Sequence, residues 1–320
     1  MVGKITSDKK ITGSVAATLL NANPYSTRNE LLVKILAARG VEGYTTPEFN
    51  AGEAADWGNT IEPFIISEAA ARLNIRKFDD EITDVYSYED LFEVSLDGIL
   101  YNDAKITLRP TDNIIFPQGQ DEIILEGNGI IEAKLTGAAK RETPPEFRGF
   151  WQVMMGMLCT EMKWAVVATL YKGTELVLYV YETDSECFES LIEAGNDFYS
   201  RLDGPDWYPA FDGYDAASIY ENGEDDLPSI DLKQIEDSAA DYYEAKTTIK
   251  SLEKMVKELE PIIMDQMGNH THAFLKDSDN NIVFEVKWPM RRTKAQPEKV
   301  VPAKAEKYER QKSLSFSVPK

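Results

Sequence analysis

The 320-residue chain contains few cysteines, few histidines and no long apolar segment. Its two cysteines, Cys159 and Cys187, cannot form a disulfide framework, so we expect a reducing cytoplasm. The two histidines, His270 and His272, disfavour chemistry built on several imidazoles, and any metal site should prefer magnesium or manganese to zinc. No apolar run reaches the roughly 18 residues that span a bilayer, and no secretory signal is visible. We therefore expect no membrane partner.

Positive charge is also scarce, because 34 Lys and Arg stand against 55 Asp and Glu, for a formal net charge of −21. A uniformly acidic surface disfavours a nucleic-acid coat, whose footprint is basic. The charge is uneven, however: residues 184–228 hold 13 acids and one base, whereas residues 291–320 hold nine bases and three acids. An acidic average can hide a local basic groove, so charge alone does not identify the partner.

The apolar spacing predicts helices first, then strands, then a helix and a hairpin. We expect helices over 11–22, 28–38, 53–73 and 147–161, strands over 91–100 and 129–135 with a hairpin-like insertion between them, and a hairpin over 164–182. This order predicts an α/β core with a central mixed β-sheet flanked by helices.

A C-terminal extension follows the core, with a long helix over 232–267 and a second hairpin over 272–288. The apolar stripe of the long helix fits either a coiled coil or packing on its own domain. We divide the chain into four parts: an α/β core at 1–200, an acidic Pro/Gly-rich connection at 201–230, a helix and hairpin extension at 231–290, and a basic tail at 291–320.

Glu132 and Lys134 are the first candidate site residues. Side chains alternate along a strand, so these two share one face of the sheet. A carboxylate beside an ammonium suits metal-assisted phosphodiester hydrolysis, because the acid holds a hard cation and the lysine serves the attacking water. The Asp/Glu-x-Lys pattern recurs in this chain, and Glu285 and Lys287, in the second hairpin, form a rival pair.

Asp97 and Glu62 supply two further carboxylates. Asp97 ends the strand that precedes Glu132, and the two acids together can chelate one magnesium ion. The alternative for Asp97 is an ordinary Asp-Gly turn. Glu62 lies in a helix next to Pro63, which removes a backbone donor from that turn. Glu62 either completes the metal site or is a solvated helix acid.

Several short motifs follow one another in a recognisable order. They are Ile11-Thr12-Gly13-Ser14, Asn23-Pro24-Tyr25-Ser26, Gly58-Asn59-x-x-Glu62-Pro63, Ser95-x-Asp97-Gly98, Glu132-x-Lys134 after two apolar residues, and Phe150-Trp151-Gln152-Val153. By their order and spacing, about residues 11–184 resemble the phage lambda-exonuclease-like, or YqaJ-like viral recombinase, group of PD-(D/E)XK nucleases.

The resemblance implies a PD-(D/E)XK, restriction-endonuclease-like core. It implies Mg²⁺-dependent digestion of linear double-stranded DNA from its 5′ ends, with Mn²⁺ as a substitute. The product is a 3′ single strand for a phage single-strand annealing protein, made in the cytoplasm of a bacterial host. Lambda-type relatives form ring trimers, so we expect a homo-oligomer and favour a trimer.

The resemblance also assigns roles by position. It makes Asp97 and Glu132 the metal ligands, Lys134 the residue that serves the nucleophilic water, Glu62 the helix carboxylate and Gln152 the glutamine near the site.

It further places Ser14 in a pocket for the 5′-phosphate. The arginine-bearing segment that the family carries before this motif is replaced by Ser-Asp-Lys-Lys. Lys9, Lys10 or Arg28 would then bind the terminal phosphate. Whether digestion strictly requires a 5′-phosphate is left open.

Two other functions fit the same residues. One is a PD-(D/E)XK endonuclease of the restriction or resolvase type, which a preference for linear over closed circular DNA would exclude. The other is a non-catalytic acidic interaction protein on a nuclease fold, which magnesium-dependent release of nucleotides would exclude.

Overall fold

The computed structural model describes residues 6–45, 52–204, 206–220 and 227–288. The chain forms two compact units, Met1–Ile219 and Tyr220–Lys320. The basic tail expected at 291–320 lies outside the described residues. Within the described part of the chain, no helix is both long and apolar enough to cross a membrane.

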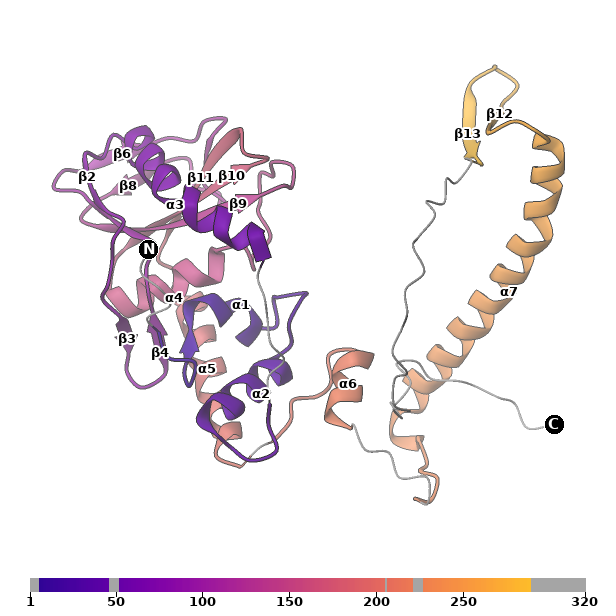
Figure 1. Cartoon of the computed structure of the whole chain (residues 1–320), viewed down its shortest axis with the longest axis horizontal. Coiled ribbons are helices and arrows are strands. Elements are labelled where there is room, and N and C mark those ends of the chain that lie inside the picture. Colours follow the sequence, from indigo (N-terminus) through magenta and orange to yellow (C-terminus); the bar gives the residue numbers. More distant parts are fainter. Residues whose placement is uncertain (1–5, 46–51, 205, 221–226, 289–320) are drawn as a thin grey trace, which may run out of the picture. The chain divides into compact units, whose positions relative to one another are not determined.

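A six-stranded mixed sheet forms the centre of the first unit (Figure 1). Its strands, in spatial order, are β2 (Lys77–Asp79), β5 (Gly98–Tyr101), β9 (Gly129–Thr136), β10 (Trp164–Tyr171), β11 (Glu175–Glu182) and β7 (Ile114–Ile115). β9 is parallel to β10 and β7 is parallel to β11, while the other neighbours are antiparallel. The predicted hairpin at 164–182 is confirmed, because β10 and β11 pair over their whole length.

Helices cover both faces of this sheet. α3 (Gly52–Arg72) packs Ile65 and Ile66 against Ile131 and Val166 on one face. The other face carries α1 (Ala16–Leu19), α2 (Arg28–Arg39), α4 (Phe150–Thr160) and α5 (Ser185–Leu202). Burial of apolar side chains on both sides is the main stabilising term of such a three-layer arrangement. The predicted α/β core with a mixed sheet flanked by helices is confirmed.

Smaller sheets complete the first unit and correct two predictions. β1 (Ile11–Thr12), β4 (Phe92–Val94) and β3 (Tyr86–Tyr88) form a three-stranded sheet, and β1 leads into a 3₁₀ turn, η1 (Gly13–Val15). The helix predicted over 11–22 is therefore wrong in its first half. The strand predicted over 91–100 is two strands, β4 and β5, in different sheets. In the insertion between β5 and β9, β6 (Ile106–Leu108) and β8 (Ile123–Leu125) pair in the antiparallel sense expected of a hairpin, but β7, which lies between them in the chain, joins the central sheet.

Part of the acidic stretch is anchored to the first unit through α6 (Gly213–Ile219). Asp215 is 4% exposed and accepts hydrogen bonds from Thr27 Oγ1, Asn29 Nδ2 and the backbone N–H of Phe211, each at 2.8 Å. Thr27 also caps α2, in a capping box with Glu30. One buried carboxylate thus joins the start of α2 to α6.

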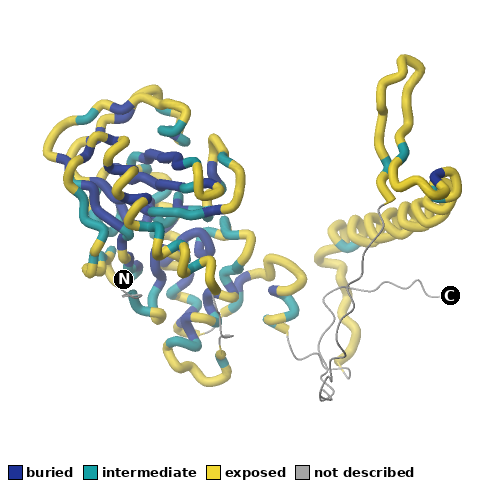
Figure 2. Tube along the Cα trace, turned by 45° about the horizontal axis from the view of Figure 1, so that its top comes forward, coloured by how far each residue is buried: buried dark blue, intermediate teal, exposed yellow. Residues whose placement is uncertain are grey.

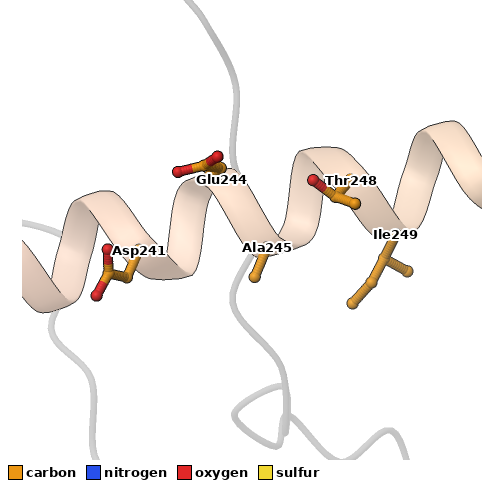
Figure 3. Close-up of a pocket in the computed structure, with 5 residues that line it drawn as sticks. All are labelled: Asp241, Glu244, Ala245, Thr248 and Ile249. Carbon is orange, nitrogen blue, oxygen red and sulfur yellow. The ribbon is translucent and has the colours of Figure 1, made fainter.

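The second unit contains a 3₁₀ turn, η2 (Lys233–Ile235), the long helix α7 (Glu236–Met267), and a hairpin of β12 (His272–Lys276) and β13 (Ile282–Lys287). The predicted long helix and second hairpin are confirmed. Most of the described residues of this unit are exposed (Figure 2), including the apolar stripe of α7, where Leu252 is 53% and Val256 is 55% exposed. A shallow depression on α7 contains none of the candidate catalytic residues (Figure 3); it is lined by Asp241, Glu244, Ala245, Thr248 and Ile249.

Candidate active site

The site begins where β5 separates from β9. Gly98 lies opposite Ile131, and in the described residues the pairing of these two strands does not continue beyond that point. The backbone N–H of Ala133 donates to Asp97 Oδ2 at 2.9 Å. A side chain therefore takes the place of a strand partner, and the Asp97 carboxylate is fixed beside β9.

Glu132 and Lys134 share one face of β9, because residues two apart in a strand point the same way. This face is the one on which α4 lies, as the contact of Lys134 with Gln152 shows. The Lys134 ammonium donates to Glu132 Oε1 and, at 3.2 Å, to Gln152 Oε1 on α4. Glu132 is only 4% exposed, whereas the Lys134 side chain is 32% exposed. The Glu-x-Lys pair and the motif glutamine thus form one hydrogen-bonded group that solvent reaches at the lysine.

Burial and negative charge shift the protonation equilibria of this group. Burial raises the pKa of Glu132 to about 8, the Asp97 carboxylate adds to the rise, and Lys134 opposes it. Burial lowers the pKa of Lys134, but the carboxylates of Glu132, Asp97 and Glu62 outweigh that effect and hold it above its ordinary value. The lysine is therefore charged, and one ammonium neutralises only part of the surrounding negative charge.

Glu62 belongs to the same electrostatic group although α3 packs on the opposite face of the sheet. Burial raises the pKa of Glu62 to about 7, Asp97 adds to the rise, and Lys134 opposes it. Glu62 is therefore within electrostatic reach of both side chains. Of the residues predicted from the sequence, the structure brings together Glu62, Asp97, Glu132, Lys134 and Gln152.

Ser14 lies at the edge of this group. A Cβ atom on Gly13 would lie 3.4 Å from Gln152 Cγ and 3.3 Å from Val94 Cγ1, so η1 packs directly on α4 and β4. Ser14 itself is exposed, and its hydroxyl lies 3.1 Å from Thr12 Oγ1. The predicted phosphate-pocket serine is thus one residue from a contact with the motif glutamine.

The three predicted phosphate-binding cations have other contacts. Lys10 forms an ion pair with Glu93 (Nζ–Oε1, 3.0 Å), which raises its pKa. Lys9 makes its hydrogen bonds through the backbone, and its carbonyl accepts from Arg39. The Arg28 guanidinium lies 4.2 Å from the centroid of the Tyr208 ring. The structure does not join these cations to the Glu132–Lys134 group.

The rival pair, Glu285 and Lys287, lies on β13 in the second unit. Glu285 is exposed, and its Oε2 lies 3.3 Å from His272 Nε2. Across the described residues, no second carboxylate is paired with either side chain of this rival pair. The arrangement seen at Glu132 is not repeated there.

Sequence reasoning did not single out Arg148, which lies in the loop between β9 and α4. Its Nη1 donates to Thr136 Oγ1 at 2.8 Å, and Thr136 shares the β9 face of Glu132 and Lys134. An arginine just before a helix gives no signal in the sequence, because only the fold returns this loop to β9.

A comparison with protein families matches residues 6–163 to the YqaJ-like viral recombinase domain. This part of the chain belongs to the YqaJ-like viral recombinase family. The YqaJ-like domain runs from β1 through α4, so it includes all five residues that the site brings together. Ser14, Lys9, Lys10 and Arg28 also fall inside it.

Two solved structures are similar to the chain that carries this YqaJ-like domain. An alkaline exonuclease from Laribacter hongkongensis has a TM-score of 0.41 and 15% identity, over 62% of this chain and 89% of its own. A phage-related exonuclease from Haemophilus somnus 129PT has a TM-score of 0.38 and 13% identity, over 60% of this chain and 94% of its own. No curated protein matches the chain.

Proposed function

We propose that this protein is a divalent-metal-dependent exonuclease that digests linear double-stranded DNA from its 5′ ends. The observation that carries the proposal is the grouping of Asp97, Glu132, Lys134 and Gln152 where β5 leaves β9, inside a YqaJ-like domain. The proposed core type is PD-(D/E)XK. The 3′ single strand that remains would be the substrate of a phage annealing protein in the cytoplasm of a bacterial host.

The residues present fit a hard divalent cation. All the ligand atoms are oxygens, and burial first, then the neighbouring Asp97 carboxylate, raises the pKa values of Glu132 and Glu62, so a bound cation would favour their charged forms. Within the described residues, no three or more Asp, Glu, His or Cys side chains are grouped closely enough to hold an ion by themselves. Asp97 and Glu132 would therefore hold Mg²⁺, or Mn²⁺, with water completing its shell, as Mg²⁺ prefers.

Such an ion stabilises charge on the phosphoryl oxygens and lowers the pKa of bound water. Lys134 is the protein's own cation at that position, and its ammonium is aimed by two acceptors, Glu132 Oε1 and Gln152 Oε1. It would orient the attacking water and offset charge that develops on the phosphate. Glu62 would add a carboxylate from α3. Ser14, with Lys9, Lys10 or Arg28, would bind the terminal 5′-phosphate.

A homo-oligomer, with a trimer favoured, belongs to the same proposal. The family resemblance supports it, and so does the exposed stripe of α7, on which Ile249, Leu252 and Val256 are each about half exposed. A ring around the duplex would keep the enzyme on its substrate despite its acidic composition. A monomeric mass at micromolar concentration, with processive digestion retained, would contradict this part.

The decisive experiment uses a linear duplex labelled separately at each 5′ end, with Mg²⁺ present or chelated and with molar mass measured in parallel. We expect metal-dependent release of 5′-terminal nucleotides and long 3′ single strands. Covalently closed circular DNA of the same sequence should resist digestion. Cleavage of the circle would indicate the endonuclease instead, and no cleavage of either substrate would favour the non-catalytic interaction protein.

A further inference from the structure

Arg148 lies beside the catalytic face of β9 and takes no part in the chemistry described above. Along that face, Thr136 is two residues beyond Lys134, about 6.6 Å further on at the rise of a β-strand. Thr136 is 8% exposed, and its Oγ1 accepts the hydrogen bond from Arg148 Nη1 at 2.8 Å. The guanidinium is therefore held next to the strand that carries Glu132 and Lys134.

Gly149 fixes this placement. Its φ is +105°, and a Cβ atom there would lie 2.8 Å from Val167 Cγ1, so a larger residue would push the loop away from the sheet. Val167 is the β10 partner of Glu132. The contact between Gly149 and Val167 therefore fixes the position of the start of α4, which carries Gln152, and also the position of Arg148.

The guanidinium keeps donors for a ligand. It has five N–H groups, and the contact with Thr136 uses one of them. In the described residues no carboxylate forms an ion pair with Arg148, and the nearby Glu146 accepts from Trp151 Nε1 at 3.0 Å. A planar guanidinium matches two oxygens of a phosphate, and Arg148 is half-buried, which limits screening by water.

We propose that Arg148 binds a backbone phosphate of the DNA strand under digestion, adjacent to the scissile phosphate. It would fix the register of that strand over Glu132 and Lys134. The inference rests on the proposed nuclease function and adds a phosphate-binding position to it.

The test compares Arg148→Gln with Arg141→Gln, which removes the same charge from an exposed position on the same loop. Binding to a duplex is measured by fluorescence anisotropy in chelator, so that nothing is cut, at several salt concentrations. Arg148→Gln should raise Kd by about 10- to 100-fold, the range for one charge-assisted hydrogen bond. The slope of log K against log salt should fall by about 0.9. Arg141→Gln should change both quantities little.

A second measurement identifies the phosphate. Single methylphosphonates, which remove one negative charge, are placed in turn along the strand near the 5′ end. One position should weaken binding of the wild-type protein and have no further effect on Arg148→Gln. Arg148→Lys, which keeps the charge but loses the planar guanidinium with its paired N–H donors, should bind more tightly than Arg148→Gln and more weakly than the wild type. Melting curves of each variant show whether the fold is retained.

The outcomes separate the two proposals. If the wild type digests linear duplex but Arg148→Gln binds like Arg141→Gln, and the methylphosphonate scan gives no coupled position, the role of Arg148 is refuted and the nuclease stands. If the wild type neither binds nor digests duplex DNA, both proposals fail.

Discussion

Replacing Lys134 by alanine should slow DNA hydrolysis by about 10²–10³-fold, or about 3–4 kcal/mol of transition-state stabilisation. The magnitude follows from the position of the ammonium, which Glu132 and Gln152 hold in place before any substrate arrives. Because the ammonium is already in place, no free energy is spent on moving it as charge develops in the transition state. Nucleotide release should be measured under single-turnover conditions, so that neither binding nor product release masks the chemical step.

The two proposed metal ligands give a different result. Asp97→Ala or Glu132→Ala should abolish metal-dependent cleavage, because each removes half of the proposed cation site. Binding of uncleaved duplex in chelator should be retained in both variants. It should become tighter for Asp97→Ala, since less negative charge then faces the phosphates, and change less for Glu132→Ala near pH 7, because the raised pKa of Glu132 keeps that group mostly protonated. Lys134→Ala should weaken the same binding, because it removes the one cation of the group.

The matched control is the rival pair. Glu285→Ala and Lys287→Ala remove the same residue types from the same Glu-x-Lys spacing on β13, where Glu285 is exposed and contacts His272. These variants should leave the rate nearly unchanged. If they abolish cleavage while Glu132 and Lys134 prove dispensable, the active site has been placed on the wrong strand.

Three further predictions concern stability, pH and the tail. Asp215→Ala leaves three donors without their acceptor, so it should lower the free energy of unfolding by about 3 kcal/mol in urea titrations. The control, Asp212→Ala, removes only the cap of α6 and should lower it by about 1 kcal/mol. The folded protein holds a proton on Glu62 up to pH about 7, above the ordinary pKa of 4.5. With metal removed by chelator, the contribution of Glu62 to the free energy of unfolding should therefore be full below pH 4.5 and be lost by about pH 7. Glu62→Gln should flatten that part of the dependence of the unfolding free energy on pH. Deleting residues 291–320 removes nine bases and three acids and should weaken duplex binding and its salt dependence; an unchanged salt slope would show that the tail does not touch DNA.

Local signals predicted the elements that depend on neighbours in the sequence. α2 has its capping box at Thr27 and Glu30 and ends at Gly40, which has a φ of +77°. The three-residue turn between β10 and β11, Lys172–Thr174, has positive φ at Lys172 and Gly173, and Gly173 adopts such a φ without a steric cost. In each case the residues that specify the structure lie within a few positions of it, so a single sequence is sufficient.

α5 is not among the predicted elements, although the sequence contains the pattern of an amphipathic helix there. Its buried residues, Leu191, Gly195, Phe198 and Leu202, recur at helical spacing, and Asp184 caps its first turn. The segment is also rich in acids, and a solvated acidic face and a buried apolar face are compatible on one helix. Net charge over a window therefore says little about whether the window folds.

The division of residues 91–100 between two sheets is the feature that the sequence could not supply, and it creates the site. β4 buries alternate residues, whereas β5 buries three residues in succession, Gly98–Leu100, and no residue of the segment shows which strand each half will pair with. β5 begins only at Gly98, opposite Ile131, so β9 continues past its neighbour and exposes the N–H of Ala133 to Asp97. If one continuous strand had paired with β9, its backbone would have satisfied that N–H, and the Asp97 carboxylate would have lost the contact that holds it beside Glu132. The residue types of the site are therefore readable from the sequence, whereas their convergence depends on a long-range strand break that only the folded chain contains.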